Sequence, residues 1–335
     1  MHVPDGLLDA PTSLATGALA AAGVALALRK ARVELDERTA PLAGLTAAFV
    51  FAAQMINFPV GIGTSGHTMG GALAAVLIGP WTGVLALSVV VMVQALLFAD
   101  GGLTALGTNI TLIGLTTVVV GWVVTRAVLV VLPRRPTSVV PAAAIGAFLS
   151  VPAAAALFVV LFVIGGGASL PVGGLTASML GWHSLIGIGE AVMTGLTVSA
   201  VITVRPDLVY AARGLQPALL LKRADGSVIE APDEPVPVAG RSRLLLIGGG
   251  LTTVVLAGLV SLFASASPDG LEYVADDQGF ADAARDHPFG QFVLADYGDV
   301  GGIPVGLAGL LGVLVTVVVG ALVFRIVRRS RQPDW

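Results

Sequence analysis

Cysteine is absent from this sequence, and charged residues are scarce. Without Cys the chain can form neither disulfide bonds nor thiolate metal ligands, so any metal site must use His, carboxylate, backbone or amino-terminal donors. Only 12% of the 335 residues are charged, whereas soluble domains carry about 25%. A phosphate-binding loop is also missing, because neither Lys30 nor Lys222 follows a glycine. These absences argue against a soluble domain and against ATP binding through such a loop.

Long apolar segments account for most of the chain, of which 56% is hydrophobic. Crossing a bilayer as a helix takes about 20 apolar residues. Segments of this kind lie near 12–28, 41–57, 81–98, 109–132, 139–165, 183–203, 243–264 and 303–325, and the shorter, Gly-rich 67–80 counts as an incomplete span. We therefore predict an all-α polytopic membrane protein with about nine transmembrane helices, divided into a seven-helix domain and a two-helix hairpin.

The basic residues follow alternate spans. They are Arg29, Lys30, Arg32, Arg38, Arg126, Arg134, Arg135, Arg205, Arg213, Lys222, Arg223, Arg241, Arg243, Arg325, Arg328, Arg329 and Arg331. Nine alternating spans put all of them on one side, with Arg285 alone on the other, and Lys and Arg mark the cytoplasmic side. We expect a plasma-membrane protein with an extracytoplasmic amino terminus and a cytoplasmic carboxyl terminus.

Composition also divides the chain lengthwise. Residues 1–210 form the predicted seven-span domain, and the polar, Pro-rich 211–242 is typical of a cytoplasmic linker. Residues 243–335 form the hairpin, whose outer loop, 265–302, is acidic. The tetrapeptide Pro-Asp-Gly-Leu occurs twice, at 4–7 and 268–271, both times on the predicted outer side.

The first two residues, Met1 and His2, offer three nitrogen donors to a metal. These are the α-amine, the His2 amide nitrogen and the His2 Nδ1, a planar set that suits Ni(II) or Cu(II). The terminus lacks the basic region of a cleaved signal peptide and carries Asp5 and Asp9 instead, so we expect Met1 to persist with a free amine. The alternative is a His that follows the start codon by chance.

A second His, His67, lies in a Gly-rich segment on the same predicted side. Its imidazole would supply the fourth nitrogen of a square plane, with Thr64 and Ser65 orienting it. Irregular backbone at membrane depth is tolerated where it lines a cavity. The alternative for His67 is an ordinary position at the membrane interface.

Other polar residues allow both structural and functional interpretations. Asp100, followed by two glycines, would form a turn or hold the metal-bound loop, and Asn109 follows close by. His183 and Glu190 are seven residues apart and share a helix face, where they would serve in helix packing or as a proton relay. His287, in the acidic loop, fits a solvated surface residue.

Taken together, the motifs resemble those of the CbiM/NikM family. The relevant sequences are Met-His-x-Pro-Asp-Gly at 1–6, Gly-Thr-Ser-Gly-His at 63–67, Gln-Ala-Leu-Leu-Phe-Ala-Asp-Gly-Gly at 94–102 and His-x-x-Ile-Gly-x-Gly-Glu at 183–190. Ser-Pro-Asp-Gly-Leu-Glu at 267–272 resembles the two-span accessory component of the same transporters, which is CbiN/NikN-like or PDGLE-type. Val3, where Ile is more usual, and Thr68, where an apolar residue is expected, are departures that remove no ligand.

The resemblance implies a substrate-capture subunit of an energy-coupling-factor transporter, with Met1, His2 and His67 binding Ni2+ or Co2+ as the transported substrate. It implies as partners a transmembrane coupling protein and separate cytoplasmic ATPases, within the lipid bilayer. We expect no enzymatic activity, no organic cofactor and no nucleic acid partner. The alternative function is a proton-coupled secondary metal transporter. The sequence does not decide between nickel and cobalt.

Overall fold

The computed structural model describes residues 1–35, 39–215, 220–222, 228–230, 241–295, 297 and 302–329. The long helices are α1 (Ala10–Glu34), α2 (Thr39–Gln54), α4 (Pro80–Leu97), α6 (Thr117–Val131), α7 (Val139–Gly165), α8 (Val172–Val204), α9 (Arg241–Gly258) and α11 (Val305–Arg329). Shorter elements are β1 (Phe58–Gly61), β2 (Thr64–Gly66), α3 (Gly71–Ile78), α5 (Leu106–Asn109), β3 (Leu220–Lys222), β4 (Val228–Glu230) and α10 (Gly270–Gln278). Of the residues and segments named above, Arg38, Arg223, Arg331 and most of the linker lie outside the described residues.

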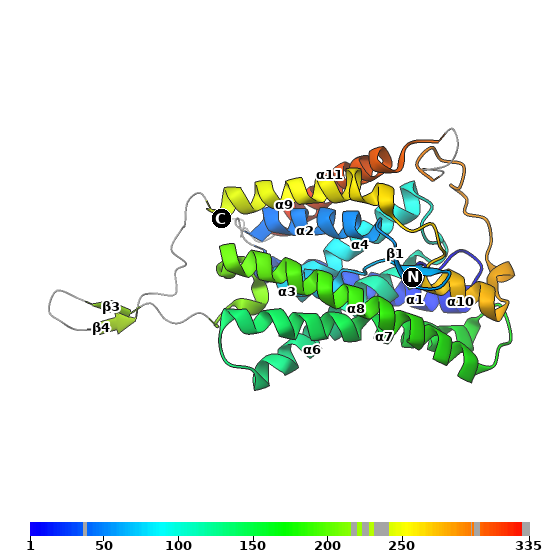
Figure 1. Ribbon diagram of the computed structural model, residues 1–335, viewed down its shortest axis with the longest axis horizontal. Coiled ribbons are helices and arrows are strands. Elements are labelled where there is room, and N and C mark those ends of the chain that lie inside the picture. The colour runs from blue at the N-terminus through cyan, green and yellow to red at the C-terminus, as the bar shows by residue number, and fades with distance from the viewer. Residues whose placement is uncertain are drawn as a thin grey trace.

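The long helices run side by side along one axis (Figure 1). At one end of the bundle, the start of α1 meets the end of α7 through the hydrogen bond from Asp9 N to Gly165 O, 2.7 Å long. At the opposite end, Glu34 at the end of α1 accepts hydrogen bonds from Trp81 N and Thr82 N at the start of α4. We call these the site end and the linker end. Helix α1 therefore runs from the site end to the linker end, whereas α4 begins at the linker end and α7 finishes at the site end.

Each of the nine predicted apolar segments forms a helix. Within the described residues, seven helices are long and apolar enough to cross a membrane, and α2 is a shorter apolar helix of 16 residues. The eight residues of α3 are all buried, which fits the prediction of an incomplete span. Gly79 separates α3 from α4 and has a φ of 94°, a backbone conformation that residues other than Gly rarely adopt. The predicted all-α, polytopic membrane architecture is confirmed.

Three local elements differ from the expectation. Helix α8 begins at Val172 rather than near residue 183. The antiparallel pair β1–β2 and the helix α10 have no counterpart among the predicted spans. Both are short, and α10 is too acidic to register as an apolar segment. Its start is defined instead by a capping box between Asp269 and Glu272.

The carboxyl-terminal hairpin packs on α2, with α9 and α11 both in contact with that helix (Figure 1). Gly306 and Gly309 of α11 let it approach the backbone of Ala257 and Gly258 closely, because an added Cβ would collide there. The segment between α9 and α11 crosses the site end of the bundle, where Ser265 N donates to the carbonyl oxygen of Asn57 over 2.8 Å. The hairpin thus reaches over the first seven spans.

Charged side chains are distributed unequally between the two ends. In the described helices and their connections, the basic residues near the linker end are Arg29, Lys30, Arg32, Arg126, Arg134, Arg135, Arg205, Arg213, Arg243, Arg325 and Arg328. Arg285 lies at the site end, where its backbone N–H donates to the carbonyl oxygen of Asp5. The described basic residues, apart from Arg285, therefore lie near one end of the bundle, as the alternation of the predicted spans requires.

The loop that leads into α3 is fixed by Glu190 of α8. Its carboxylate accepts the N–H groups of Met69 at 2.6 Å and Gly70 at 2.7 Å, and Glu190 is fully buried. Gln54 holds the same loop by donating to the Met69 carbonyl oxygen over 2.7 Å. Gly70 has a φ of 78°, so the chain turns sharply at this point. His67 precedes this anchored turn.

Removing the Glu190 carboxylate should destabilise the fold, because two buried N–H groups lose their acceptor. Each unpaired buried donor costs about 1–3 kcal/mol, so we expect Glu190→Ala to lose about 3 kcal/mol and to unfold several degrees below the wild type. Glu190→Gln keeps one carbonyl oxygen and should lie between the two. Thermal unfolding of the purified protein measures the effect, and equal unfolding temperatures for Glu190→Ala and wild type would contradict this role.

Candidate metal centre

The first residues of the chain lie inside the bundle. Met1, His2 and Val3 are only 2%, 8% and 0% exposed. The buried backbone is paired, because Val3 N donates to Asn109 Oδ1 at 2.7 Å, and Asn109 Nδ2 donates to Val3 O at 3.0 Å. Gly102 N donates to the same carbonyl over 2.9 Å. Asn109 therefore pairs with the backbone of residues 1–4 as a β-strand would. These residues belong to no sheet, and we call them the amino-terminal strand only for this pairing.

Asp5 fastens the strand where it turns toward α1. Its carboxylate accepts hydrogen bonds from the backbone of Leu103 at 3.1 Å and Thr104 at 2.7 Å. The turn continues through Gly6, with a φ of 83°. Gly102 passes so near that an added Cβ would lie 2.6 Å from Asp5 Oδ1. The glycines and Asp5 thus set how deeply Met1 reaches into the bundle.

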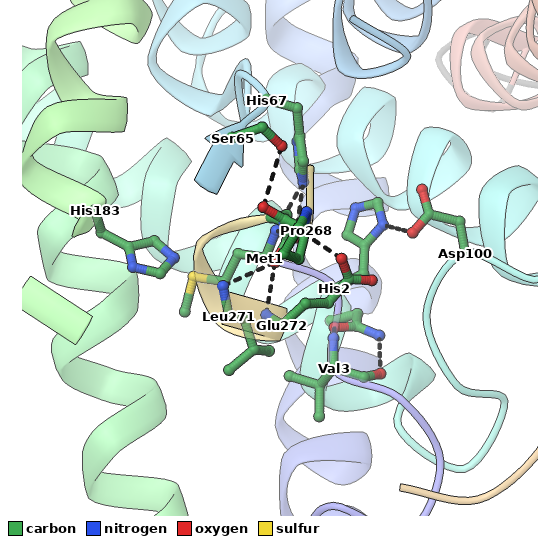
Figure 2. Close-up of polar contacts among 12 residues, drawn as sticks. Met1, His2, Val3, Ser65, His67, Asp100, His183, Pro268, Leu271 and Glu272 are labelled. Carbon is green, nitrogen blue, oxygen red and sulfur yellow. Dashed lines mark hydrogen bonds and ion pairs between the residues drawn. The ribbon is translucent and has the colours of Figure 1, made fainter. Parts of the chain in front are cut away.

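The α-amine of Met1 meets two side chains that are distant in sequence (Figure 2). It lies 2.7 Å from His67 Nε2 and donates to Asp269 Oδ2 at 2.6 Å. His67 Nδ1 lies 3.0 Å from the Thr68 carbonyl oxygen. Since a carbonyl only accepts hydrogen bonds, the proton is on Nδ1, and the lone pair of Nε2 faces the amine. That nitrogen is in the form that binds metals.

The second residue, His2, contacts Asp100 through Nδ1 (Figure 2). Its Nε2 is buried and has no hydrogen-bond partner among the described residues. The imidazoles of His2 and His67 are adjacent, with ring centroids 5.0 Å apart. The Met1 amine and His67 Nε2 are therefore in direct contact, and the His2 imidazole lies next to them.

Burial and charge shift the pKa values of the groups in these loops. Burial lowers the pKa of the His67 imidazole, and the Met1 ammonium lowers it further. Burial alone would raise the pKa of Asp269, but the Met1 ammonium holds it well below its usual value. Burial would likewise raise the pKa of Asp100, but the neighbouring His2 holds the pKa of this carboxyl below its usual value. Two ionised carboxylates therefore face the cluster of nitrogens.

A cavity of about 390 Å³ adjoins the cluster and is lined in part by His2 and Asp269. Asp100, Glu272 and Asp276 also line it. Burial raises the pKa of Glu272, and the neighbouring Asp269 carboxylate adds to the increase. Four carboxyl groups, from two distant parts of the chain, therefore lie among the residues that line the space beside the nitrogens.

The remaining predicted residues lie around this centre in other roles. Ser65 donates to the carbonyl oxygens of Ser267 at 2.7 Å and Pro268 at 3.2 Å, and Thr64 Oγ1 donates to the Ser65 carbonyl. The described contacts of Ser65 thus join β2 to the hairpin, and the contact of Thr64 stays within β2. His183 donates from Nδ1 to the Met179 carbonyl oxygen and packs against the start of α10. Figure 2 shows it to one side of Met1.

The sequence does not reveal the contacts of two residues at the centre. Asp269 is one acid of an acidic loop, and Asn109 is a polar residue close to Asp100 in the sequence. The available signal was the repeated Pro-Asp-Gly-Leu, which places Asp5 and Asp269 at equivalent positions on the same side. The repeat does not reveal that the second copy contacts residue 1.

Side chains alone do not form a metal site in the described part of the chain. No group of three or more His, Cys, Asp or Glu residues there is arranged to hold a metal ion. Main-chain nitrogens are further donors at this position, and the α-amine of Met1 lies 2.7 Å from His67 Nε2. Backbone donors combined with imidazole suit a metal high in the Irving–Williams series.

Two parts of the chain match known protein families. Residues 2–208 match the model of CbiM, the cobalt uptake substrate-specific transmembrane region, and residues 243–329 match the PDGLE domain. A protein of Archaeoglobus fulgidus, provisionally named as the fused nickel transport protein NikMN, is 32% identical over 99% of both chains. A provisionally named metal transport protein of Haloquadratum walsbyi is 37% identical over 63% of this chain and 94% of its own length.

A solved structure shares the fold of the larger part. The crystal structure of a truncated transition metal transporter superposes with a TM-score of 0.54, at 30% identity, over 61% of this chain and 99% of that one. The family model covers more than half of the sequence, and the Archaeoglobus relative spans nearly all of it. The chain therefore belongs to the family of nickel and cobalt transport proteins that includes CbiM and the fused NikMN proteins.

Proposed function

We propose that this chain is the substrate-capture subunit of an ATP-driven importer of Ni2+ or Co2+. The ion would bind to the Met1 amine, the His2 amide nitrogen and Nδ1, and His67 Nε2. The observation that carries this proposal is the 2.7 Å separation between Met1 N and His67 Nε2. Metal–nitrogen bonds of about 2.0 Å place adjacent donors of a square plane about 2.8 Å apart, so these two atoms already have the required spacing.

Binding requires one rearrangement at His2. Its Nδ1 contacts the Asp100 carboxylate, which only accepts hydrogen bonds, so this nitrogen carries a proton in the structure. Chelation by Nδ1 means that the ring turns from Asp100 toward the Met1 amine and loses that proton. Asp100 and Asp269 would then offset the positive charge of the ion. A planar nitrogen set favours Ni(II) over Co(II), and the relatives include transport proteins named for each metal.

The charge distribution supports capture from outside the cell. Basic residues gather at the linker end, and this pattern marks the cytoplasmic side of membrane proteins. The metal centre at the site end would then face the exterior, with the carboxyl terminus in the cytoplasm. We also propose the division into residues 1–210 for capture, 211–242 as a cytoplasmic linker and 243–335 as an accessory hairpin. Coupling would come from a separate transmembrane protein and cytoplasmic ATPases.

Adding one residue before Met1 should abolish ion binding, because it moves the α-amine by about 3.8 Å. We expect the native chain to retain Ni2+ after purification and the extended chain to lose it, as measured by bound-metal analysis. His67→Ala should weaken Ni2+ affinity by at least about 100-fold, the upper range for second-shell losses at metal sites. His287→Ala, which removes an imidazole from the outer loop, is the matched control. Equal metal content in the native and extended chains would refute the site.

Acidification should weaken Ni2+ binding, because the nitrogen ligands must lose protons to bind. The pKa of His67 lies below its ordinary value of about 6.5, so this imidazole is already neutral at pH 7. Protonation of His67 should therefore reduce affinity only at the acidic end of a titration. Calorimetric titrations between about pH 8 and about pH 5 test this, and a constant affinity would contradict it.

Uptake should require other subunits. We expect liposomes that contain this chain alone to accumulate no radioactive Ni2+ under a pH gradient, since the proposed energy source is ATP hydrolysis on separate subunits and the chain has no phosphate-binding loop of its own. Accumulation driven by the gradient, and abolished by a protonophore, would instead favour the proton-coupled secondary transporter. His183 and Glu190 would then be the residues to examine as a relay.

A further inference from the structure

Asp269 of the hairpin lies in direct contact with the amino terminus. Its two carboxylate oxygens have separate partners. Oδ1 accepts the N–H groups of Leu271 at 2.7 Å and Glu272 at 2.9 Å and so caps α10. Oδ2 accepts from the Met1 amine at 2.6 Å and lies 3.6 Å from His67 Nε2. One oxygen therefore belongs to the helix, and the other belongs to the metal centre.

The position of this carboxylate is fixed from several directions. Glu272 accepts the Asp269 N–H at 3.0 Å, which completes the capping box. The carbonyl oxygen of the preceding residue, Pro268, accepts from Ser65 N at 2.9 Å. Strand β2 therefore holds the hairpin at a point two residues before His67. Helix α10 packs on α8. Asp269 is itself only 8% exposed. Its Oδ2 is thus presented to the amine by a rigid support.

The amine needs such a partner. Met1 is 2% exposed, and a buried charge without an opposite charge is strongly unfavourable. His67 is neutral and the Asn109 amide is occupied by Val3, so Asp269 supplies the opposite charge at the amine. Without it the first residue would be drawn toward water, away from His67. Order in the amino-terminal strand therefore depends on a residue of the hairpin.

We propose that Asp269 is a positioning residue of the ion site, which holds the Met1 amine beside His67 until the ion arrives. The proposal rests on the function proposed above. It gives the accessory hairpin a defined task, which is to complete the capture site with one carboxylate. The apparent affinity of a site falls in proportion to the fraction of molecules in which it is correctly arranged. Loss of the contact should therefore weaken ion binding even though no nitrogen ligand is removed.

Asp269→Asn isolates this contact from the helix cap. Asn caps helices about as well as Asp, so α10 keeps its start while the amine loses its negatively charged partner. Asp277→Asn is the matched control, because it removes the same charge from the same helix at an exposed position, where Asp277 accepts from Gln278. Any general effect of acidity near the site appears in both variants, and only Asp269→Asn alters the amine contact.

The first measurement is the rate at which an amine-reactive ester labels Met1 in the full-length, ion-free protein. Mass spectrometry of the amino-terminal peptide separates Met1 from Lys30 and Lys222. We expect Asp269→Asn to label at least tenfold faster than wild type, with Asp277→Asn unchanged. An unchanged rate in Asp269→Asn, or an equal increase in Asp277→Asn, would overturn the proposal.

The second measurement is Ni2+ affinity in the same proteins. We expect about a tenfold weaker Kd for Asp269→Asn, corresponding to about 1.4 kcal/mol, and no change for Asp277→Asn. Equal affinity in Asp269→Asn and wild type would overturn the positioning role. Failure of the wild type to bind Ni2+ would instead refute the proposed function, while the labelling comparison, made without the ion, would still report on the amine contact.

Discussion

A charged amine buried inside a membrane protein is the constraint around which this structure is arranged. Burying the Met1 amine is unfavourable unless opposite charge and hydrogen bonds surround it. Asp269 supplies the charge, while Asn109 and Asp5 pair the strand that delivers it. The glycines at 101 and 102 allow that strand to pass at close range. Residues from both ends of the sequence therefore fix the position of the Met1 amine nitrogen.

The same constraint explains why the bundle includes irregular backbone. His67 reaches the amine from a loop, not from a helix, and that loop is held by Glu190, Gln54 and the short pair β1–β2. Such backbone survives at membrane depth only where protein groups satisfy it. The fully buried α3 is short because its segment is partly used for this loop. Residues 58–78 must therefore form both the irregular loop that carries His67 and the buried helix α3.

Much of this arrangement was predictable because a bilayer restricts both helix length and charge placement. The nine apolar segments and the gathering of basic residues at one end follow from those restrictions. The meeting of Met1, His2 and His67 was expected from donor chemistry and a shared side. Asp269 was not, because its contact with residue 1 has no periodic signal in the sequence. Ser65 was assigned to His67 on sequence proximity, whereas β2 directs it to Pro268.

The sequence separation of 268 residues between Met1 and Asp269 has a consequence for biosynthesis. At elongation rates of about 5–20 residues per second, the amine emerges roughly 15–50 s before the carboxylate that neutralises it. During that interval the amino-terminal strand has His67, Asn109 and Asp5 available but lacks its charge partner. The contact between Met1 and Asp269 can therefore form only after the hairpin has been synthesised. A chain truncated before the hairpin would keep every nitrogen donor but would lack the carboxylate that pairs with its amine.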